Sequence, residues 1–357
     1  MSKARQLAQK PNQPTGRKNL IINGAMNVAQ RGTSTTGVNS NTYASLDRFK
    51  NLINEGTFTV SQSSEAPAGF SNSYKLDCTT ADTSLAAAGR VTLDTYLEGQ
   101  DLQQIQKGLS TAKQVTLSFW VKSSVTGTYI VELFDIDNSR HISKSYSISS
   151  ADTWEKKEIL IDADTTGAFG DDNGASLQIR WWLAAGSNYT SGTLATTWQA
   201  QDNTDRAVGL SVNIADSTSN DWYITGVQLE VGSTATEFEH RSYGEELQLC
   251  KRYYQKYIFA DNIPVVNVVN WDGSNVYGTF PFDVEMRAVP TPDNSAASTF
   301  DVLQAGVVNN PTAITIQNES KHNAEWTAGG ISDTQGQAAW VRGDGSSEVF
   351  ISFDAEL

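Results

Sequence analysis

Cysteine and histidine are scarce in this sequence of 357 residues. Two cysteines as distant as Cys78 and Cys250 are not a disulfide framework, and they suit a protein made in a reducing cytoplasm. The three histidines, His141, His240 and His322, lie in no nucleophile motif. Because the sequence also lacks a glycine-rich phosphate loop and a metal-ligand spacing, we expect no enzymatic activity. Carboxylates are plentiful, however, and counting alone does not exclude a glycosidase pair.

Long apolar runs are also missing. No stretch approaches the ~20 apolar residues of a membrane span, so we expect no membrane insertion. The opening residues MSKAR are not followed by an apolar stretch, so no signal peptide is expected, and export would depend on lysis. The chain has 26 basic and 40 acidic residues and a net charge of −14, which argues against nucleic-acid binding.

The start of the chain carries a local excess of positive charge. Residues 1–18 contain no acid and five basic residues, which are Lys3, Arg5, Lys10, Arg17 and Lys18. A polar segment without apolar periodicity cannot bury enough surface to fold alone. We therefore expect an extended arm, either a disordered tail or an anchor that orders against an acidic partner.

Most of the remaining chain has the pattern of short antiparallel strands between polar turns. Apolar and polar residues alternate over residues 115–122 and 177–183, as in sheets with one buried and one solvated face. We expect an all-β protein, with a jelly-roll-like antiparallel β-sandwich over residues 19–240 and a smaller β domain over residues 258–357. Trp181 and Trp222 are expected in the core.

One strand carries a phase slip. In WYITGVQLEVG, residues 222–232, the apolar side chains lie first on even and then on odd positions. A strand alternates faces with period two, so both sets are buried only if one residue is inserted. We expect a β-bulge at Gly226.

A helix is expected to link the two β regions. Ser242 and Glu245 have capping-box spacing, and Leu247, Cys250, Tyr254 and Tyr257 follow at helical spacing. The pattern predicts a helix over residues 242–257 within a linking segment, 241–257.

Several segments together resemble a known family. They are NLIINGAMNVAQRGT (19–33), LDRF (46–49), SFWVK (118–122), TWEKK (153–157), the phase-slipped strand with TEFE (236–239), LCKRYY (249–254) and MRAVPT (286–291). In this order they resemble tail fibres and minor structural proteins of tailed bacteriophages, which carry a carbohydrate-binding-like β-sandwich. The resemblance covers roughly residues 19–257, and the last hundred residues fit it more loosely.

The resemblance implies a homotrimeric virion protein, most simply a short tail fibre whose N-terminal arm docks to an acidic adaptor, tail or capsid protein. Three functions follow from it: attachment to host-surface glycans, a purely structural role as a capsid or tail decoration, and a cell-surface depolymerase. The missing catalytic constellation disfavours the third. Sequence separates the first two poorly, because an arm, a sandwich and a trimer serve both.

Glycan attachment would need exposed aromatic rings, on which sugars stack their C–H faces. Alternation and loop position give five candidates, which are Trp120, Trp182, Tyr189, Trp198 and Trp271. Each ring has the alternative of packing within the fold or at a subunit contact.

No organic cofactor is expected. A calcium site is a weaker expectation than glycan binding, because no EF-hand loop is present. Acidic loop residues offer the oxygen ligands that Ca²⁺ prefers, and they are Asp135, Asp137, Asp171 and Asp172. Solvated turns are the better explanation of the same residues.

Overall fold

The computed structural model describes residues 17–332, 334–344 and 349–357, and these divide into two compact units. The first, the sandwich unit, consists of residues 17–27, 34–44 and 49–241. The second, the C-terminal unit, combines Ser242–Leu357 with two N-terminal segments, Val28–Thr33 and Ser45–Arg48. The consecutive ranges predicted from the sequence do not assign these two N-terminal segments to the C-terminal unit. Within the described ranges, no helix is long and apolar enough to cross a membrane.

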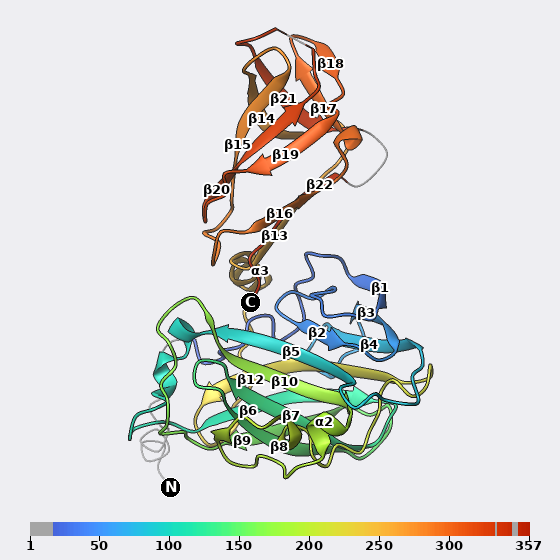
Figure 1. The fold of residues 1–357 in the computed structure, drawn as a ribbon, viewed down its shortest axis with the longest axis vertical. Helices are drawn as coiled ribbons and strands as arrows, with labels where there is room; N and C mark the ends of the chain where they lie inside the picture. The colour runs from blue at the N-terminus through green and yellow to red at the C-terminus, as the bar shows by residue number, and fades with distance from the viewer. Residues whose placement is uncertain (1–16, 333, 345–348) are drawn as a thin grey trace. The chain divides into compact units, whose positions relative to one another are not determined.

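The sandwich unit contains two six-stranded antiparallel sheets, as expected for a jelly-roll-like sandwich (Figure 1). The first sheet has the order β1-β3-β4-β12-β6-β9. Its strands are β1 (Ser34–Val38), β3 (Thr57–Ser63), β4 (Ser73–Thr80), β12 (Asp221–Val231), β6 (Val115–Ser123) and β9 (Glu155–Ile161). The second sheet has the order β11-β8-β7-β10-β5-β2. Its strands are β11 (Gln199–Ala200), β8 (Arg140–Ile148), β7 (Gly127–Asp135), β10 (Ala175–Ala185), β5 (Arg90–Glu98) and β2 (Lys50–Ile53).

The core of this unit lies between the two sheets and is rich in aromatic rings. Phe119 of β6 meets Trp181 of β10 edge-on, with ring centroids 5.8 Å apart, and it meets Tyr146 of β8 at 5.2 Å. Trp181 and Trp222 are completely buried, which confirms the prediction for both. Edge-to-face pairs of this kind stabilise a core beyond the area that they bury.

The bulge predicted at Gly226 is confirmed. The pairing of β12 with β6 shifts register between Thr225 and Gln228, and Gly226 has a φ of +63°. On either side of the shift, Ile224 and Val227 are both fully buried. A positive φ is readily adopted by glycine, and a Cβ at this position would lie 2.6 Å from the Phe70 ring.

The C-terminal unit begins with a helix that is shorter than predicted. The helix α3 (Tyr243–Lys251) starts with the expected capping box, in which the Ser242 side chain accepts from the Glu245 N–H. It ends at Lys251, so the prediction of helix to residue 257 is wrong. The tyrosines at 254 and 257 belong to a strand, β13 (Tyr254–Phe259), because pairing with a neighbouring strand outweighs a short helical pattern.

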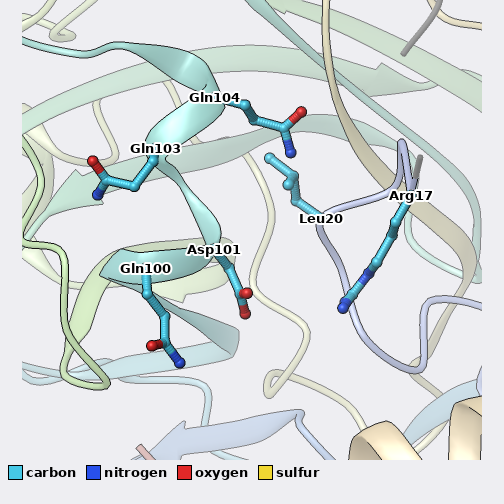
Figure 2. A pocket seen from close by; sticks show the side chains of 6 residues that line it. All are labelled: Arg17, Leu20, Gln100, Asp101, Gln103 and Gln104. Carbon is cyan, nitrogen blue, oxygen red and sulfur yellow. The ribbon is translucent and has the colours of Figure 1, made fainter. Parts of the chain in front are cut away.

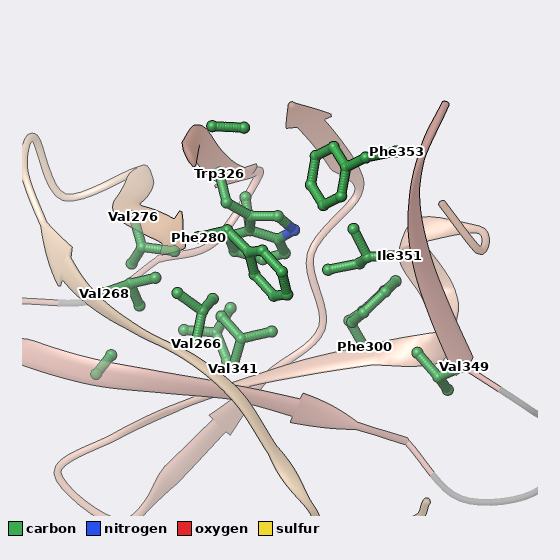
Figure 3. Packing of buried hydrophobic residues seen from close by; sticks show 14 of the residues in the cluster. Val266, Val268, Val276, Phe280, Phe300, Trp326, Val341, Val349, Ile351 and Phe353 are labelled. Atoms are coloured by element: carbon green, nitrogen blue, oxygen red, sulfur yellow. The ribbon is translucent and has the colours of Figure 1, made fainter. Parts of the chain in front are cut away.

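This unit contains a three-stranded and a seven-stranded sheet, both antiparallel. The smaller has the order β13-β22-β16, with β22 (Val349–Asp354) and β16 (Thr291–Asn294). The larger has the order β18-β17-β21-β14-β15-β20-β19. Its strands are β18 (Val307–Asn309), β17 (Phe300–Gln304), β21 (Ala338–Gly343), β14 (Pro264–Asn270), β15 (Asn275–Pro281), β20 (Asn323–Gly329) and β19 (Ala313–Gln317). Side chains from both sheets, among them Trp326, Phe300 and Phe353, form one apolar cluster (Figure 3).

The two N-terminal segments are held in the C-terminal unit by arginines. The Arg48 guanidinium lies over the Tyr253 ring, 3.4 Å from its centroid, and forms an ion pair with the buried Glu356 carboxylate. The Arg31 guanidinium lies 3.6 Å from the Tyr254 centroid and 3.5 Å from a Glu356 oxygen. Stacking and ion pairing together fix both segments against the last residues of the chain.

Candidate functional site

Two of the five candidate rings are covered rather than exposed. Trp182 lies on the face of β10 that was expected to be solvated, yet it is completely buried. Residues 186–212, here called the covering segment, fold over that face, and the Tyr189 ring packs against Trp182 with centroids 5.0 Å apart. The predicted exposure of Trp182 is therefore wrong, because a two-residue alternation does not reveal what lies over a sheet.

Charged side chains beneath the covering segment explain how a polar face is buried. Burial acts to raise the pKa of Glu132, but the Arg206 charge and a hydrogen bond from His141 outweigh it and lower the pKa to about 2. Arg206 Nε donates to Glu132 Oε1 at 2.8 Å, and Trp182 Nε1 donates to Oε2 at 3.0 Å. His141 Nδ1 donates to the same carboxylate at 3.2 Å. This buried carboxylate is bound by the protein's own donors and serves the fold.

The other two candidates of the sandwich unit are partly buried. The indole N–H of Trp198 donates to the Asp162 carbonyl at 2.8 Å, and the Lys107 ammonium lies 5.3 Å from the centroid of the ring. Trp120 lies beside the bulge, because a Cβ built on Gly226 would be 3.1 Å from its Cδ1 atom. Both rings contribute to packing and are only partly exposed.

Trp271 is the candidate that the structure leaves open, with 71% of its surface exposed. It follows the last residue of β14 in the turn toward β15, and its backbone N–H donates to the Asn275 carbonyl at 3.0 Å. Asp272 closes the turn by accepting from the N–H groups of Ser274 and Asn275. The backbone around the ring is therefore fixed while the ring remains accessible.

A second exposed indole, Trp340, belongs to the same sheet and was not among the candidates. It lies on β21 and is 50% exposed. Alternation in AAWVR, residues 338–342, places it on a face with Ala338 and Arg342, so the signal was present in the sequence. Val269 and Val308, 46% and 45% exposed, lie on the same side of the sheet. Exposed apolar side chains that gather on one face mark interaction surfaces.

The sandwich unit also contains a polar cavity of about 290 Å³ (Figure 2). It is lined by Arg17, Leu20, Gln100, Asp101, Gln103 and Gln104. The Gln103 amide already donates to the carbonyls of Gly99 and Gly170, at 2.9 and 2.8 Å. In Figure 2 the Gln104 amide points toward Leu20. The cavity offers hydrogen-bonding groups but no aromatic ring.

The proposed anchor falls mostly outside the described residues. Lys3, Arg5 and Lys10 are not among them. Arg17 Nε donates to the Asn19 carbonyl at 3.2 Å, and Lys18 Nζ donates to Thr236 Oγ1 at 2.7 Å. These two cations are bound to the sandwich unit, and the rest of the predicted arm lies outside the described residues.

Three of the four acidic loop residues considered for calcium have partners within the protein. Asp135 forms an ion pair with Lys107. Asp137 accepts from the Gly170 N–H and Asp172 from the Gly174 N–H, each at 2.8 Å, and Asp171 is exposed. In the part of the chain that the structure describes, no group of three or more His, Cys, Asp or Glu side chains is arranged to hold a metal ion.

Comparison with known proteins identifies similar sandwiches at low similarity. No protein-family model and no curated protein matches the sequence. A putative sugar-binding protein from Bacteroides thetaiotaomicron is 14% identical with a TM-score of 0.33, and the match covers 60% of this chain and all of that one. A carbohydrate-binding module, TmCBM61 in complex with β-1,4-galactotriose, is 10% identical with a TM-score of 0.29, over 60% of this chain and all of the module.

A phage protein is also among the structures found. The enzymatically active domain of tailspike protein 4 from bacteriophage CBA120 is 14% identical with a TM-score of 0.31. The match covers 60% of this chain but only 21% of the tailspike domain. The sandwich fold itself is established by the strand orders described above.

Proposed function

We propose that this chain is a structural protein of a tailed-phage virion, a trimeric fibre that contributes to attachment to host-surface glycans. The basic residues that precede position 17 would dock the fibre to an acidic adaptor, tail or capsid protein, since opposite charges steer such contacts. Trimerisation would present three copies of each glycan contact, which raises overall affinity without a new contact. The protein would act by binding, without a catalytic step.

The observation that carries this proposal is the exposure of Trp271. An indole that is 71% exposed on a fixed turn offers the open ring face on which a sugar can stack. The family resemblance supports the virion and fibre parts of the proposal.

Binding of the labelled full chain to intact bacteria tests this function, beside mutant cells that have lost their surface polysaccharide. Saturable binding to the parent cells and its loss on the mutants is the expected result. Trp271→Ala should weaken binding, whereas Trp154→Ala, a partly buried tryptophan of the sandwich unit, should not. Equal binding to both cell types would contradict glycan attachment.

A decoration of the capsid or tail is the second candidate, and the packing of the sandwich unit favours it. Trp182 is fully buried and the other three candidate rings of that unit are partly buried, so none of the four is as open as Trp271. A folded oligomer that binds to virions but to no host cell would be the result expected of a decoration.

A further inference from the structure

The seven-stranded sheet of the C-terminal unit has an outer face that is continuous across its strands. Leu303 of β17 pairs with Val308 of β18 on one side and with Trp340 of β21 on the other. Trp340 in turn pairs with Asn267 of β14. Directly paired side chains on one face lie ~5 Å apart, so these residues form a row across four strands.

A second row runs beside the first. Val269 of β14 pairs with Ala338 and with Tyr277, and Tyr277 pairs with Thr327 of β20. The opposite face of the same strands holds the buried cluster with Val268 and Trp326, so the rows belong to the outer side. The two rows therefore combine rings and methyl groups with the Asn267 amide and the Tyr277 phenol on one surface.

This face is almost without charge, although the chain as a whole carries −14. The seven strands contain only three ionisable side chains of Asp, Glu, Lys or Arg: Asp301, Glu325 and Arg342. The single cation among them, Arg342, is neutralised by Asp301 at 2.9 Å. Glu325 accepts from the Gln317 amide at 2.6 Å. An anionic ligand would therefore find no available cation on these strands.

The two exposed indoles are spaced for an extended ligand. Trp340 lies opposite Asn267, and Trp271 lies four residues further along β14 and its continuation. At a rise of ~3.3 Å per residue, the backbone positions that carry the two rings are about 13 Å apart along the strand direction. This separation exceeds the width of one pyranose ring, so only a chain of sugars can contact both indoles.

We infer that the outer face of this sheet binds a neutral polysaccharide chain, with Trp340 and Trp271 as stacking platforms and Asn267 and Tyr277 as hydrogen-bonding partners. The inference rests on the proposed function and names the class of glycan and the second ring. Stacking uses the C–H faces of the sugars, and the amide and the phenol bind hydroxyl groups. The absence of an available cation selects against uronic acids and other anionic sugars, because their charge would be desolvated without a partner.

The test measures binding of the full chain to an immobilised panel of polysaccharides. Neutral members are mannan, galactan, dextran and neutral bacterial surface polysaccharides, and acidic members are alginate and polygalacturonate. We expect saturable binding to at least one neutral polysaccharide, with an affinity that changes little between low and high salt. Trp340→Ala and Trp271→Ala should each lower that affinity about tenfold, and Trp340→Phe should retain most of it. Trp154→Ala is the matched control and should bind as the parent does.

The possible results separate the inference from the function on which it rests. Binding to acidic members alone, or binding that both alanine variants leave unchanged, overturns the inference while glycan attachment stands. No binding to any member contradicts glycan attachment and the inference together. If Trp340→Glu converts the oligomer into monomers in a light-scattering measurement, the face is a contact between copies of the chain and the inference is overturned.

Discussion

Gly226 is a residue whose role can be stated almost completely from its position. It combines a positive φ with a close approach to the Phe70 and Trp120 rings. The phase slip on either side of it is a signal internal to one strand. The bulge could therefore be predicted without any knowledge of neighbouring strands.

Replacing Gly226 by valine should destabilise the sandwich unit by roughly 3 kcal/mol. A β-branched residue is strained at this φ, and its Cβ would lie 2.6 Å from the Phe70 ring. The free energy of unfolding in urea measures the effect. Gly209→Val is the matched control, because Gly209 also has a positive φ but open space around its Cβ, and the smaller loss expected there isolates the clash. Equal losses in the two variants would show that the Phe70 contact is unimportant.

Single residues also show where prediction from sequence ends. Trp182 was placed on the correct face of its strand, but its exposure depends on a segment that begins four residues later in the chain. For Trp340, alternation gives the face of its strand, and the structure shows that this face is open. Alternation assigns a side chain to a face, and only the tertiary structure shows whether that face is covered.

At the scale of elements, the covering segment is held to the second sheet by buried charge. Ser143 Oγ donates to the Arg206 carbonyl at 2.8 Å, and the Arg206 side chain binds Glu132 of β7. The carboxylate whose pKa is lowered thus joins a strand to the segment that lies over it. Because the ordinary pKa of a glutamate is near 4.5, this contact contributes stability above that pH and loses it as the pH falls toward 2.

Acid should therefore release the covering segment, and Glu132→Gln should reduce this response. The lowered pKa corresponds to about 3 kcal/mol of stability that the parent protein loses between pH 4.5 and pH 2. The variant should be less stable at pH 7, because Arg206 loses its charged partner, but its stability should fall less steeply with acid. Urea unfolding at pH 7 and pH 3 measures both effects.

Glu158→Gln provides the control for this pH response, since Glu158 is an exposed residue of β9 paired only with the partly exposed Lys156. Its pH profile should match that of the parent protein. A Glu132→Gln profile that is parallel to the parent's would remove Glu132 as the source of acid sensitivity.

The predicted helix was too long because its last residues fit both a helical and a strand pattern. Ser242 and Glu245 marked its start correctly, because a capping box is a local arrangement of two side chains and two N–H groups. Its end was misplaced because Tyr254 and Tyr257 also fit a strand. The partner of that strand, β22, lies almost a hundred residues away in sequence, at residues 349–354. Long-range pairing decided the outcome.

At the scale of the whole molecule, the N-terminal part of the chain contributes two segments to the C-terminal unit. The C-terminal unit includes Val28–Thr33 and Ser45–Arg48, whose arginines stack on tyrosines and pair with Glu356. The resemblance rests in part on these segments, through AQRGT and LDR, but it does not show what they contact. A linear division of the chain does not reveal such a contribution.

Residues 242–357 expressed alone should therefore fail to fold cooperatively. Without Arg31 and Arg48, the fragment would bury the Glu356 carboxylate without its partners and expose two tyrosine faces, and breaking a buried ion pair costs about 3–5 kcal/mol. Thermal unfolding followed by circular dichroism measures cooperativity. The same fragment with residues 28–48 attached through a Gly/Ser linker should regain a transition. A sharp transition in the bare fragment would show that the N-terminal segments are dispensable.

The contribution of these segments also has a consequence for the order in which the protein is completed. A ribosome makes the N-terminal part first, so Arg31 and Arg48 leave it long before Glu356 is added. The strands from β2 to β12 have by then been synthesised and are free to pair with one another. The C-terminal unit is therefore completed only after Glu356 has been synthesised. A chain that stops before Glu356 would carry a sandwich but no completed C-terminal unit, and it would not display the Trp340 face.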